Sequence, residues 1–144
     1  MTPADRPPSS PATLYLRAAT AGIRHHAKAL TRTSDGNPPD RHHLDDLHAH
    51  IAALLRLLDH LVQVTRPEHP SAGQRLSAAR DFLWAATAAV HDSYHRLPPA
   101  DGSDDGGLPD GPPTVAICHR HLATGHLVRR TSTPTDLTRD HTPG

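Results

Sequence analysis

The segment VHDSYHRL, residues 90–97, carries two histidines four residues apart, His91 and His95, with an acid directly after the first. Residues at this spacing lie on one face of a helix, so the two imidazoles can bind one divalent metal ion. In zinc peptidases the acid at this position is a glutamate that acts as the general base. Asp92 is one methylene shorter and is predicted to point away from the apolar stripe, which disfavours a peptidase.

Histidine is unusually abundant, because the 144 residues include 14 histidines against 15 Lys and Arg and 15 Asp and Glu. Acid and base balance, which leaves no electrostatic argument for binding nucleic acid or a membrane. The charged residues are nearly all Arg and Asp, as a GC-rich coding bias produces, and that bias also accounts for part of the histidine content. We therefore interpret most of the histidines as solvated surface residues, with a metal site as the alternative.

Apolar residues recur at spacings of three and four in three stretches, which predicts three helices, over residues 11–32, 41–65 and 71–97. Each stretch opens on a helix-start signal: Pro11 at a first helical position, Asp40 as an N-cap, and Ser71 with Gln74 as a capping box. Proline-containing breaks separate the stretches. We expect an all-α protein in which residues 10–97 form an antiparallel up-down-up three-helix bundle.

The second predicted helix has the most regular apolar seam, formed by Leu44, Leu47, Ile51, Leu54, Leu58, Leu61 and Thr65. Leu55 and Val62 widen this seam on one side and Leu57 widens it on the other. A face this broad exceeds what two neighbouring helices cover, so we expect self-association or a partner helix to use Leu55, Leu57 and Val62. The third helix is expected to bury Leu76, Ala79, Leu83, Ala86, Val90 and Leu97, with Phe82 and Tyr94 at the edges.

The remaining segments are polar or rich in proline and glycine. Residues 1–9 and 131–144 are predicted to be disordered, and residues 98–113 (PPADGSDDGGLPDGPP) read as an acidic linker with four aspartates and no basic residue. Residues 114–130 are expected to be ordered. Their periodicity fits either a short helix or a hairpin, and it leaves open whether they dock on the bundle.

Alternating helix directions would gather histidines that are far apart in the sequence at one end of the bundle. His91 and His95 would then meet a third imidazole, for which the candidates are His25, His26, His48 and His50. Such a group would hold a divalent metal ion without catalysing a reaction. Protonation of the gathered imidazoles would also make them repel each other, so a pH-responsive switch is a further interpretation.

A second group of candidate metal ligands lies in CHRH and the residues that follow, namely Cys118, His119, His121 and His126. Thiolate and imidazole are ligands of zinc, but a zinc finger needs a second pair of ligands at a fixed spacing. The chain has one cysteine, which also excludes an intramolecular disulfide.

Two resemblances accompany these patterns. The pair His91 and His95 is similar to the H-x-x-x-H pair of DinB-like helical bundles, a resemblance that implies a metal ion held by three histidines. LHAHIAALLRLLDHLVQVT and ICHRHLATGHLVRR resemble segments of small uncharacterised Ala/Arg/His-rich helical proteins of actinobacteria. The second resemblance implies no activity.

The sequence has no glycine-rich phosphate loop, no G-x-S-x-G motif and no paired carboxylates, so we do not expect an enzyme. The leading prediction is a non-enzymatic helical interaction module without a bound cofactor, and a divalent metal site is the alternative. MTPADRPPSS lacks the apolar core of a secretory signal. The run IAALLRLLDHLVQV is interrupted by Arg56, Asp59 and His60, so we expect a cytoplasmic protein without a membrane span.

Overall fold

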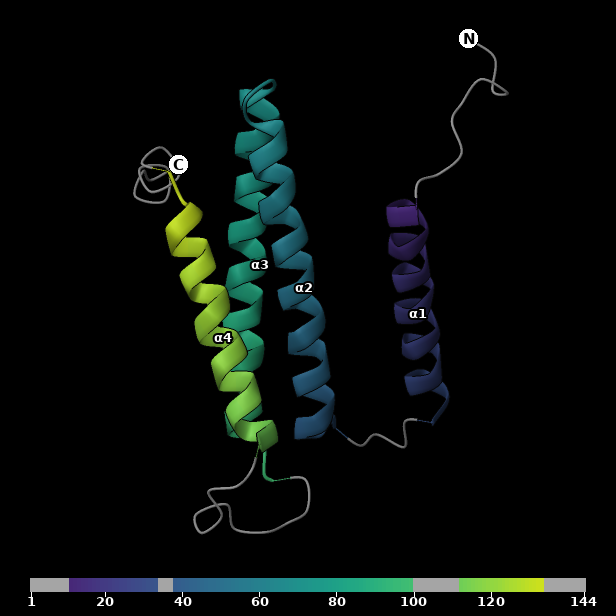
Figure 1. The fold of residues 1–144 in the computed structure, drawn as a ribbon. Coiled ribbons are helices and arrows are strands. Elements are labelled where there is room, and N and C mark those ends of the chain that lie inside the picture. Colours follow the sequence, from purple (N-terminus) through teal and green to yellow (C-terminus); the bar gives the residue numbers. More distant parts are fainter. Residues whose placement is uncertain (1–10, 34–37, 100–111, 134–144) are drawn as a thin grey trace, which may run out of the picture. The chain divides into compact units, whose positions relative to one another are not determined.

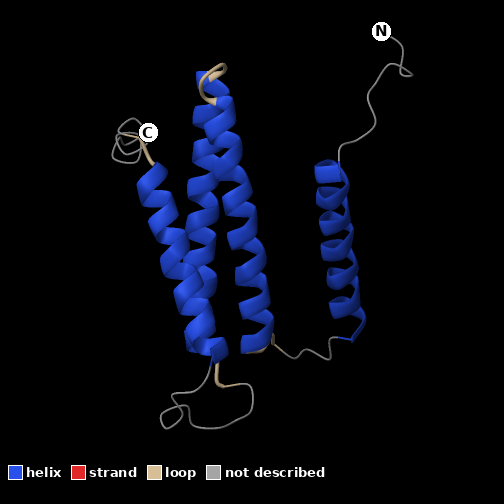
Figure 2. Ribbon diagram, in the orientation of Figure 1, coloured by secondary structure: helices blue, strands red, loops and turns tan. Residues whose placement is uncertain are grey.

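The computed structural model describes residues 11–33, 38–99 and 112–133 (Figure 1). All regular structure in these residues is helical: α1 (Pro11–Thr33), α2 (Arg41–Thr65), α3 (Pro70–Arg96) and α4 (Pro112–Thr131) (Figure 2). The all-α class expected from the sequence is therefore confirmed. The predicted disordered segment 1–9 lies outside the described residues, as do most of the predicted linker 98–113 and most of 131–144.

The chain divides into two compact units, Met1–Pro38 with α1 and Pro39–Gly144 with the other three helices. The segment 114–130, for which the sequence allowed a helix or a hairpin, is helical and belongs to α4. This helix packs on both α2 and α3. The three mutually packed helices are thus α2, α3 and α4, hereafter the α2–α4 unit, and packing of the first helix on the second and third remains a prediction.

The contacts between helix ends fix the direction of α2 and α3. Arg41, the first residue of α2, donates from Nε to the carbonyl oxygens of Tyr94 (3.1 Å) and Leu97 (2.8 Å) at the end of α3. Near the other end of the unit, Asp59 of α2 meets Arg80 of α3. The two helices therefore run in opposite directions, and the Arg41 guanidinium caps carbonyl groups that α3 leaves without a helical partner.

The direction of α4 follows in the same way. Ile117 packs in an apolar cluster with Leu44 at the start of α2 and Tyr94 at the end of α3. Thr131, the last residue of α4, accepts a hydrogen bond of 2.9 Å from Arg80. The helix α4 therefore runs parallel to α2 and opposite to α3, which brings Cys118 next to the end of α3.

Local sequence explains where α2 and α3 begin. The Asp40 carboxylate accepts the backbone N–H of His43 at 2.9 Å, so the predicted N-cap of α2 is confirmed. The predicted capping box at Ser71 is wrong, because α3 begins at Pro70, which needs no N–H donor in the first turn. The turn between the two helices is tight: a Cβ added to Gly73 would lie 2.7 Å from Cα of Arg66.

The buried faces of α2 and α3 differ from the apolar stripes predicted from the sequence. Leu47 and Leu61 of the predicted seam are exposed, and so is Phe82 of α3. The buried residues of α2 are Leu44, His48, Ala52, Leu55, Asp59 and Val62. Those of α3 are Gly73, Ser77, Arg80, Thr87 and Tyr94. A face with so many polar residues is buried because those residues find hydrogen-bond partners inside the unit, which a hydrophobic pattern does not register.

Because the buried face of α2 differs from the predicted one, the three predicted interaction residues do not share one environment. Leu55 and Val62 are fully buried in the α2–α4 unit, so the expectation that they form an uncovered apolar side is wrong. Leu57 is exposed, and the other large exposed apolar residues of α2 are Leu47, Leu61 and Val64. The uncovered apolar face of α2 therefore shares Leu47 and Leu61 with the predicted seam and extends to Leu57 and Val64, whereas Leu44 of the seam is buried, as are Leu55 and Val62.

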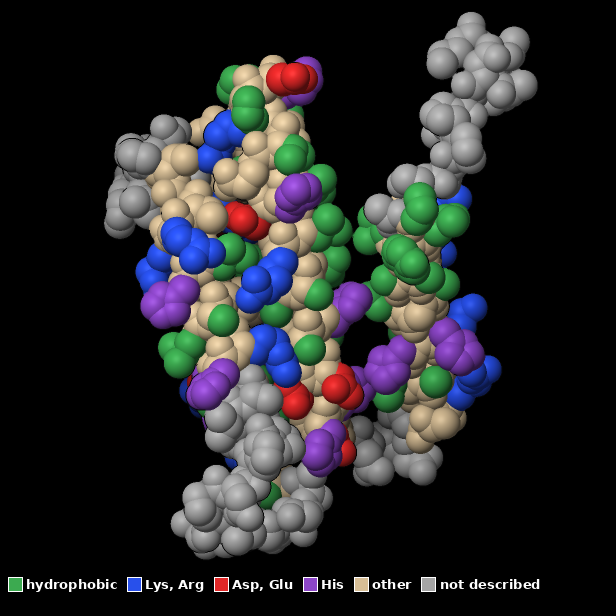
Figure 3. All heavy atoms as spheres, in the orientation of Figure 1, with side chains coloured by type: hydrophobic (Ala, Val, Ile, Leu, Met, Phe, Trp, Pro, Cys, Tyr) green, Lys and Arg blue, Asp and Glu red, His purple; other side chains and the backbone are tan. Residues whose placement is uncertain are grey.

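The helix α1 exposes most of its apolar residues, as the hydrophobic side chains along it in Figure 3 indicate. The large ones are Leu14, Tyr15, Leu16, Ile23 and Leu30. No helix among the described residues combines the length and the apolar character needed to cross a membrane.

Candidate metal site

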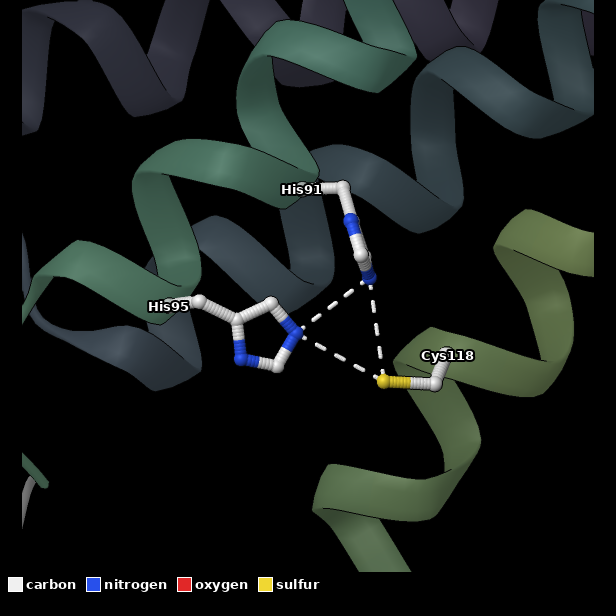
Figure 4. A group of neighbouring side chains, drawn as sticks. All are labelled: His91, His95 and Cys118. Carbon is white, nitrogen blue, oxygen red and sulfur yellow. Dashed lines mark hydrogen bonds between the residues drawn. The ribbon is translucent and has the colours of Figure 1, made fainter.

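Three side chains that can bind a metal ion converge between α3 and α4 (Figure 4). His91 and His95 come from α3 and lie one helical turn apart, and Cys118 comes from the first half of α4. The two Nε2 atoms are 3.2 Å apart. The Cys118 sulfur lies 3.7 Å from Nε2 of His91 and 3.5 Å from Nε2 of His95. We call these three residues the ligand cluster.

The apolar cluster at the start of α2 holds this group in place. Leu44, Tyr94 and Ile117 are buried there, and Cys118 packs against them. Because Tyr94 and Ile117 adjoin His95 and Cys118 in the sequence, burial of the two apolar side chains fixes the backbone that carries two of the ligands. His91 and Cys118 are half-buried and His95 is exposed, so the group lies at the surface of the unit with one open side.

His91 is also braced by aromatic rings. The His121 ring of α4 stacks on the His91 ring with centroids 4.3 Å apart and an angle of 6° between the planes. The His121 ring also stacks on Trp84 of α3, with ring centroids 4.7 Å apart and an angle of 15° between the planes. We call Trp84, His121 and His91 the ring stack. Gly125 permits this approach of α4, since a Cβ added there would lie 2.9 Å from Trp84 Cη2.

A chain of polar contacts leads from His121 to the surface of α2. Nε2 of His48 lies 3.3 Å from Nδ1 of His121, and Nδ1 of His48 lies 3.1 Å from the Arg120 guanidinium. Arg120 also pairs with Asp45 at 2.9 Å. We call Asp45, Arg120, His48 and His121 the hydrogen-bonded chain. His48, in its middle, is fully buried.

Three imidazoles of this region, those of His48, His91 and His121, have lowered pKa values. Burial, with the adjacent Arg120 guanidinium, lowers the pKa of His48 to about 4. Burial, with neighbouring histidines, also lowers the pKa of His91 and that of His121. Neutral imidazole is the form that binds metal ions, so the surroundings of His91 favour the ligating state at neutral pH.

Of the six histidines considered for this site, the structure brings together His91 and His95, and His25 lies outside the ligand cluster. The third member of the ligand cluster is Cys118, which sequence analysis had placed in a separate motif. His48 is near, but its ring nitrogens contact Arg120 and His121. His50 and His26 are outside the ligand cluster, and Nε2 of His50 is buried without a hydrogen bond in the described residues.

A family model described as a family of unknown function, DUF6238, matches residues 1–144. The chain belongs to this family. No curated protein and no solved structure matches it.

Sequence reasoning missed several residues that surround the candidate metal site. Trp84 and Arg120 were not assigned to it, and His121 was considered only as a ligand of a separate motif. The spacing of Trp84 and His91, seven residues apart on one helix, is a signal for a shared face. Nothing in the sequence alone shows that the ring between them comes from α4, because that depends on how α4 docks.

Proposed function

We propose that this protein binds a zinc ion through Nε2 of His91, Nε2 of His95 and Sγ of Cys118. Imidazole and thiolate are the common protein ligands of zinc, and a thiolate disfavours hard ions such as magnesium and calcium. The DinB-like pattern implied three histidines, and the proposed site differs from it in having a cysteine as third ligand. A thiol persists in a reducing compartment, which fits the cytoplasmic location that we propose.

The spacing of the three donor atoms is the observation that supports this proposal. Zinc binds nitrogen at about 2.0–2.1 Å and sulfur at about 2.3 Å, so tetrahedral geometry separates two nitrogens by about 3.3 Å and a nitrogen from the sulfur by about 3.6 Å. The observed separations are 3.2 Å for the nitrogens and 3.5 and 3.7 Å for the sulfur. One ion can therefore contact all three atoms without a change in the positions of α3 and α4.

We propose a binding role for the ion and not a hydrolytic one. Within the described residues the cluster has three members, which leaves a fourth coordination position for water or an added ligand. Hydrolysis would also need a general base beside that position. The acid nearest in sequence, Asp92, is exposed and pairs with Arg96 at 3.0 Å, one turn along the outer face of α3.

Titration of the untagged, chelator-treated full chain with Co²⁺ and Zn²⁺ tests this proposal. Cobalt is expected to bind in a ratio of one to one and to give a thiolate-to-cobalt charge-transfer band that an equimolar amount of zinc abolishes. Three ligands at about 3 kcal/mol each predict a zinc Kd of about 1 µM or lower. Absence of the thiolate band after one equivalent of cobalt would rule out Cys118 as a ligand and overturn the proposal.

We also propose that α1 packs on α2 through two matching stripes of apolar residues. Leu16, Ile23 and Leu30 recur every seven residues in α1, and Leu47, Leu54 and Leu61 recur every seven residues in α2. Such repeats give a helix an apolar seam that another helix can cover. The helices α3 and α4 leave part of this repeat uncovered, since Leu47 and Leu61 are exposed.

Substitution of Ile23 by aspartate distinguishes this packing from a solvated α1. Burial of an isoleucine side chain is worth about 2 kcal/mol, so Ile23→Asp is expected to lower the free energy of unfolding by at least that amount. Leu14→Asp is the matched control, because Leu14 is exposed on the opposite face of α1, and it is expected to have little effect. Urea denaturation measures both.

Light scattering of the same proteins shows whether the exposed apolar residues of α2 are covered by α1 of the same chain or by a second copy. A monomer whose stability falls only in Ile23→Asp supports packing within one chain. A dimer that Ile23→Asp dissociates would assign the seam to a second copy, and equal stabilities of the two variants would overturn the packing.

A further inference from the structure

We propose that the hydrogen-bonded chain, formed by Asp45, Arg120, His48 and His121, is a positioning device that sets the ring plane of the metal ligand His91. This inference rests on the proposed zinc site. It assigns a role to a buried imidazole and an ion pair that the three ligands do not explain.

The ring stack is the first support for this role. Trp84 and His91 lie seven residues apart on α3, which corresponds to about 10.5 Å along a helix. The His121 ring lies between them, 4.7 Å from one ring centroid and 4.3 Å from the other. Because the ring is stacked on both sides, rotation of His91 about its side-chain bonds would require His121 to move as well.

The hydrogen-bonded chain in turn fixes the position of His121. The donor and the acceptor of each hydrogen bond in this chain can be assigned. An arginine guanidinium only donates, so Nδ1 of His48 accepts from Arg120 and carries no proton. Neutral His48 therefore has its proton on Nε2 and donates it to Nδ1 of His121. The His121 proton then lies on Nε2. Each of the two rings is held in one tautomer and one orientation.

This direction also explains why His48 is not a ligand, although sequence analysis listed it as a candidate. The nitrogen that faces His121 carries the proton, and the other nitrogen is occupied by Arg120. Nη1 of Arg120, the nitrogen that faces His48, also lies 2.9 Å from the Asp45 carboxylate and 3.2 Å from the Asp45 carbonyl oxygen, so its two hydrogens are shared among three acceptors. The chain therefore starts at a guanidinium that two oxygen atoms of α2 hold in place.

Groups that orient a metal-ligating histidine raise affinity because the ligand is already in its binding geometry. Most such groups are hydrogen-bond acceptors for the second ring nitrogen. Here the orienting group is a stacked ring from another helix. Zinc affinity should therefore respond to the shape of the side chain at position 121, although His121 donates no electron pair to the ion.

The first test measures the tautomer of His48 in the metal-free full chain. Long-range nitrogen–proton correlation spectra of the histidine-labelled protein at neutral pH are expected to show the proton of His48 on Nε2. The variant Arg120→Met is expected to lose this preference. A His48 proton on Nδ1 in the unaltered chain would overturn the inference, and this result does not depend on zinc binding.

The second test compares the zinc affinity of three variants on α4. His121→Leu is expected to weaken zinc binding by about 10–100-fold, as the loss of an orienting group usually does. His121→Phe keeps a flat ring between Trp84 and His91 and is expected to restore most of the affinity. His119→Leu, a change to an exposed histidine two residues away, is expected to bind zinc as the unaltered chain does.

The outcomes separate the inference from the proposed function. If the unaltered chain binds zinc and His121→Leu binds it equally well, the positioning role is wrong and the zinc site stands. If the unaltered chain does not bind zinc, both are wrong. If His121→Leu and His121→Phe are equally weak although both are folded by circular dichroism, ring stacking is not what holds His91, and the inference fails.

Discussion

Replacement of Cys118 by serine is expected to weaken zinc binding by about 100-fold or more and to abolish the thiolate-to-cobalt band. The site offers three ligands. Zinc bound by four protein ligands gains roughly 10–16 kcal/mol, or about 3 kcal/mol per ligand, and loss of that amount corresponds to about two decades in Kd. Serine is close to cysteine in size, so the packing of Cys118 against Leu44, Tyr94 and Ile117 is largely kept.

His91→Ala and His95→Ala are expected to lose affinity by a similar factor, because each removes one donor atom. The matched control is His50→Ala. Sequence analysis considered His50 a ligand as well, but it lies outside the ligand cluster, so its removal should leave zinc binding unchanged. Competition with a chromophoric chelator measures all four variants on the untagged chain. Unchanged affinity in Cys118→Ser, or a loss in His50→Ala as large as in His91→Ala, would place the zinc ion elsewhere.

The part of this site that sequence alone could predict is the part fixed by one helix. His91 and His95 are four residues apart, and helical geometry places them on one face whatever the rest of the chain does. Their position near the start of α2 also followed from the short connection between α2 and α3, which forces opposite directions. The histidines of α2 and α3 could therefore be assigned to the same end of the unit.

The third ligand depended on information that the sequence does not contain. CHRH presents Cys118, His119 and His121 at angles of about 100° from one residue to the next around a helix. Only the docking of α4 decides that Cys118 faces α3 at the ligand cluster, that His121 enters the ring stack, and that His119 is exposed. The sequence periodicity of residues 114–130 fitted both a helix and a hairpin, so it could not predict how this segment docks on α2 and α3.

The buried faces were mispredicted for a related reason. The apolar seam through Leu47 and Leu61 is the strongest periodic signal in α2, yet both residues are exposed. The face that α2 buries includes His48 and Asp59, which are polar and interrupt any hydrophobic pattern. Their burial is favourable only because Arg120 and Arg80 reach them from other helices, and such pairs are visible only in three dimensions.

The second large effect is expected at the end of the α2–α4 unit away from the ligand cluster. Substitution of Asp59 by alanine should lower the free energy of unfolding by about 3 kcal/mol, because it leaves the buried guanidinium of Arg80 without its closest counter-charge. The Arg80 side chain is fully buried and its Nη1 lies 2.9 Å from Asp59. The same nitrogen donates to Thr131, and Nη2 donates to Ser77. One side chain thus joins all three helices of the unit.

The double variant Asp59→Leu/Arg80→Met distinguishes two contributions to the free energy of unfolding: the destabilisation caused by an unpaired buried charge and the net stabilisation by the ion pair. Removal of both charges is expected to restore most of the stability lost in Asp59→Ala, because a buried ion pair gains little over apolar side chains of similar size. Asp92→Ala is the control, since it breaks an ion pair of 3.0 Å that is exposed, and such pairs contribute about 0.2–1 kcal/mol.

Urea denaturation of these proteins can be followed by circular dichroism and by fluorescence of the single tryptophan, Trp84, which lies against α4. If Asp59→Ala is no less stable than Asp92→Ala, Arg80 is not buried as a charge and α4 is not held at this end. The ligand cluster is held separately, at the other end of the unit, by the packing of Cys118 against Leu44, Tyr94 and Ile117.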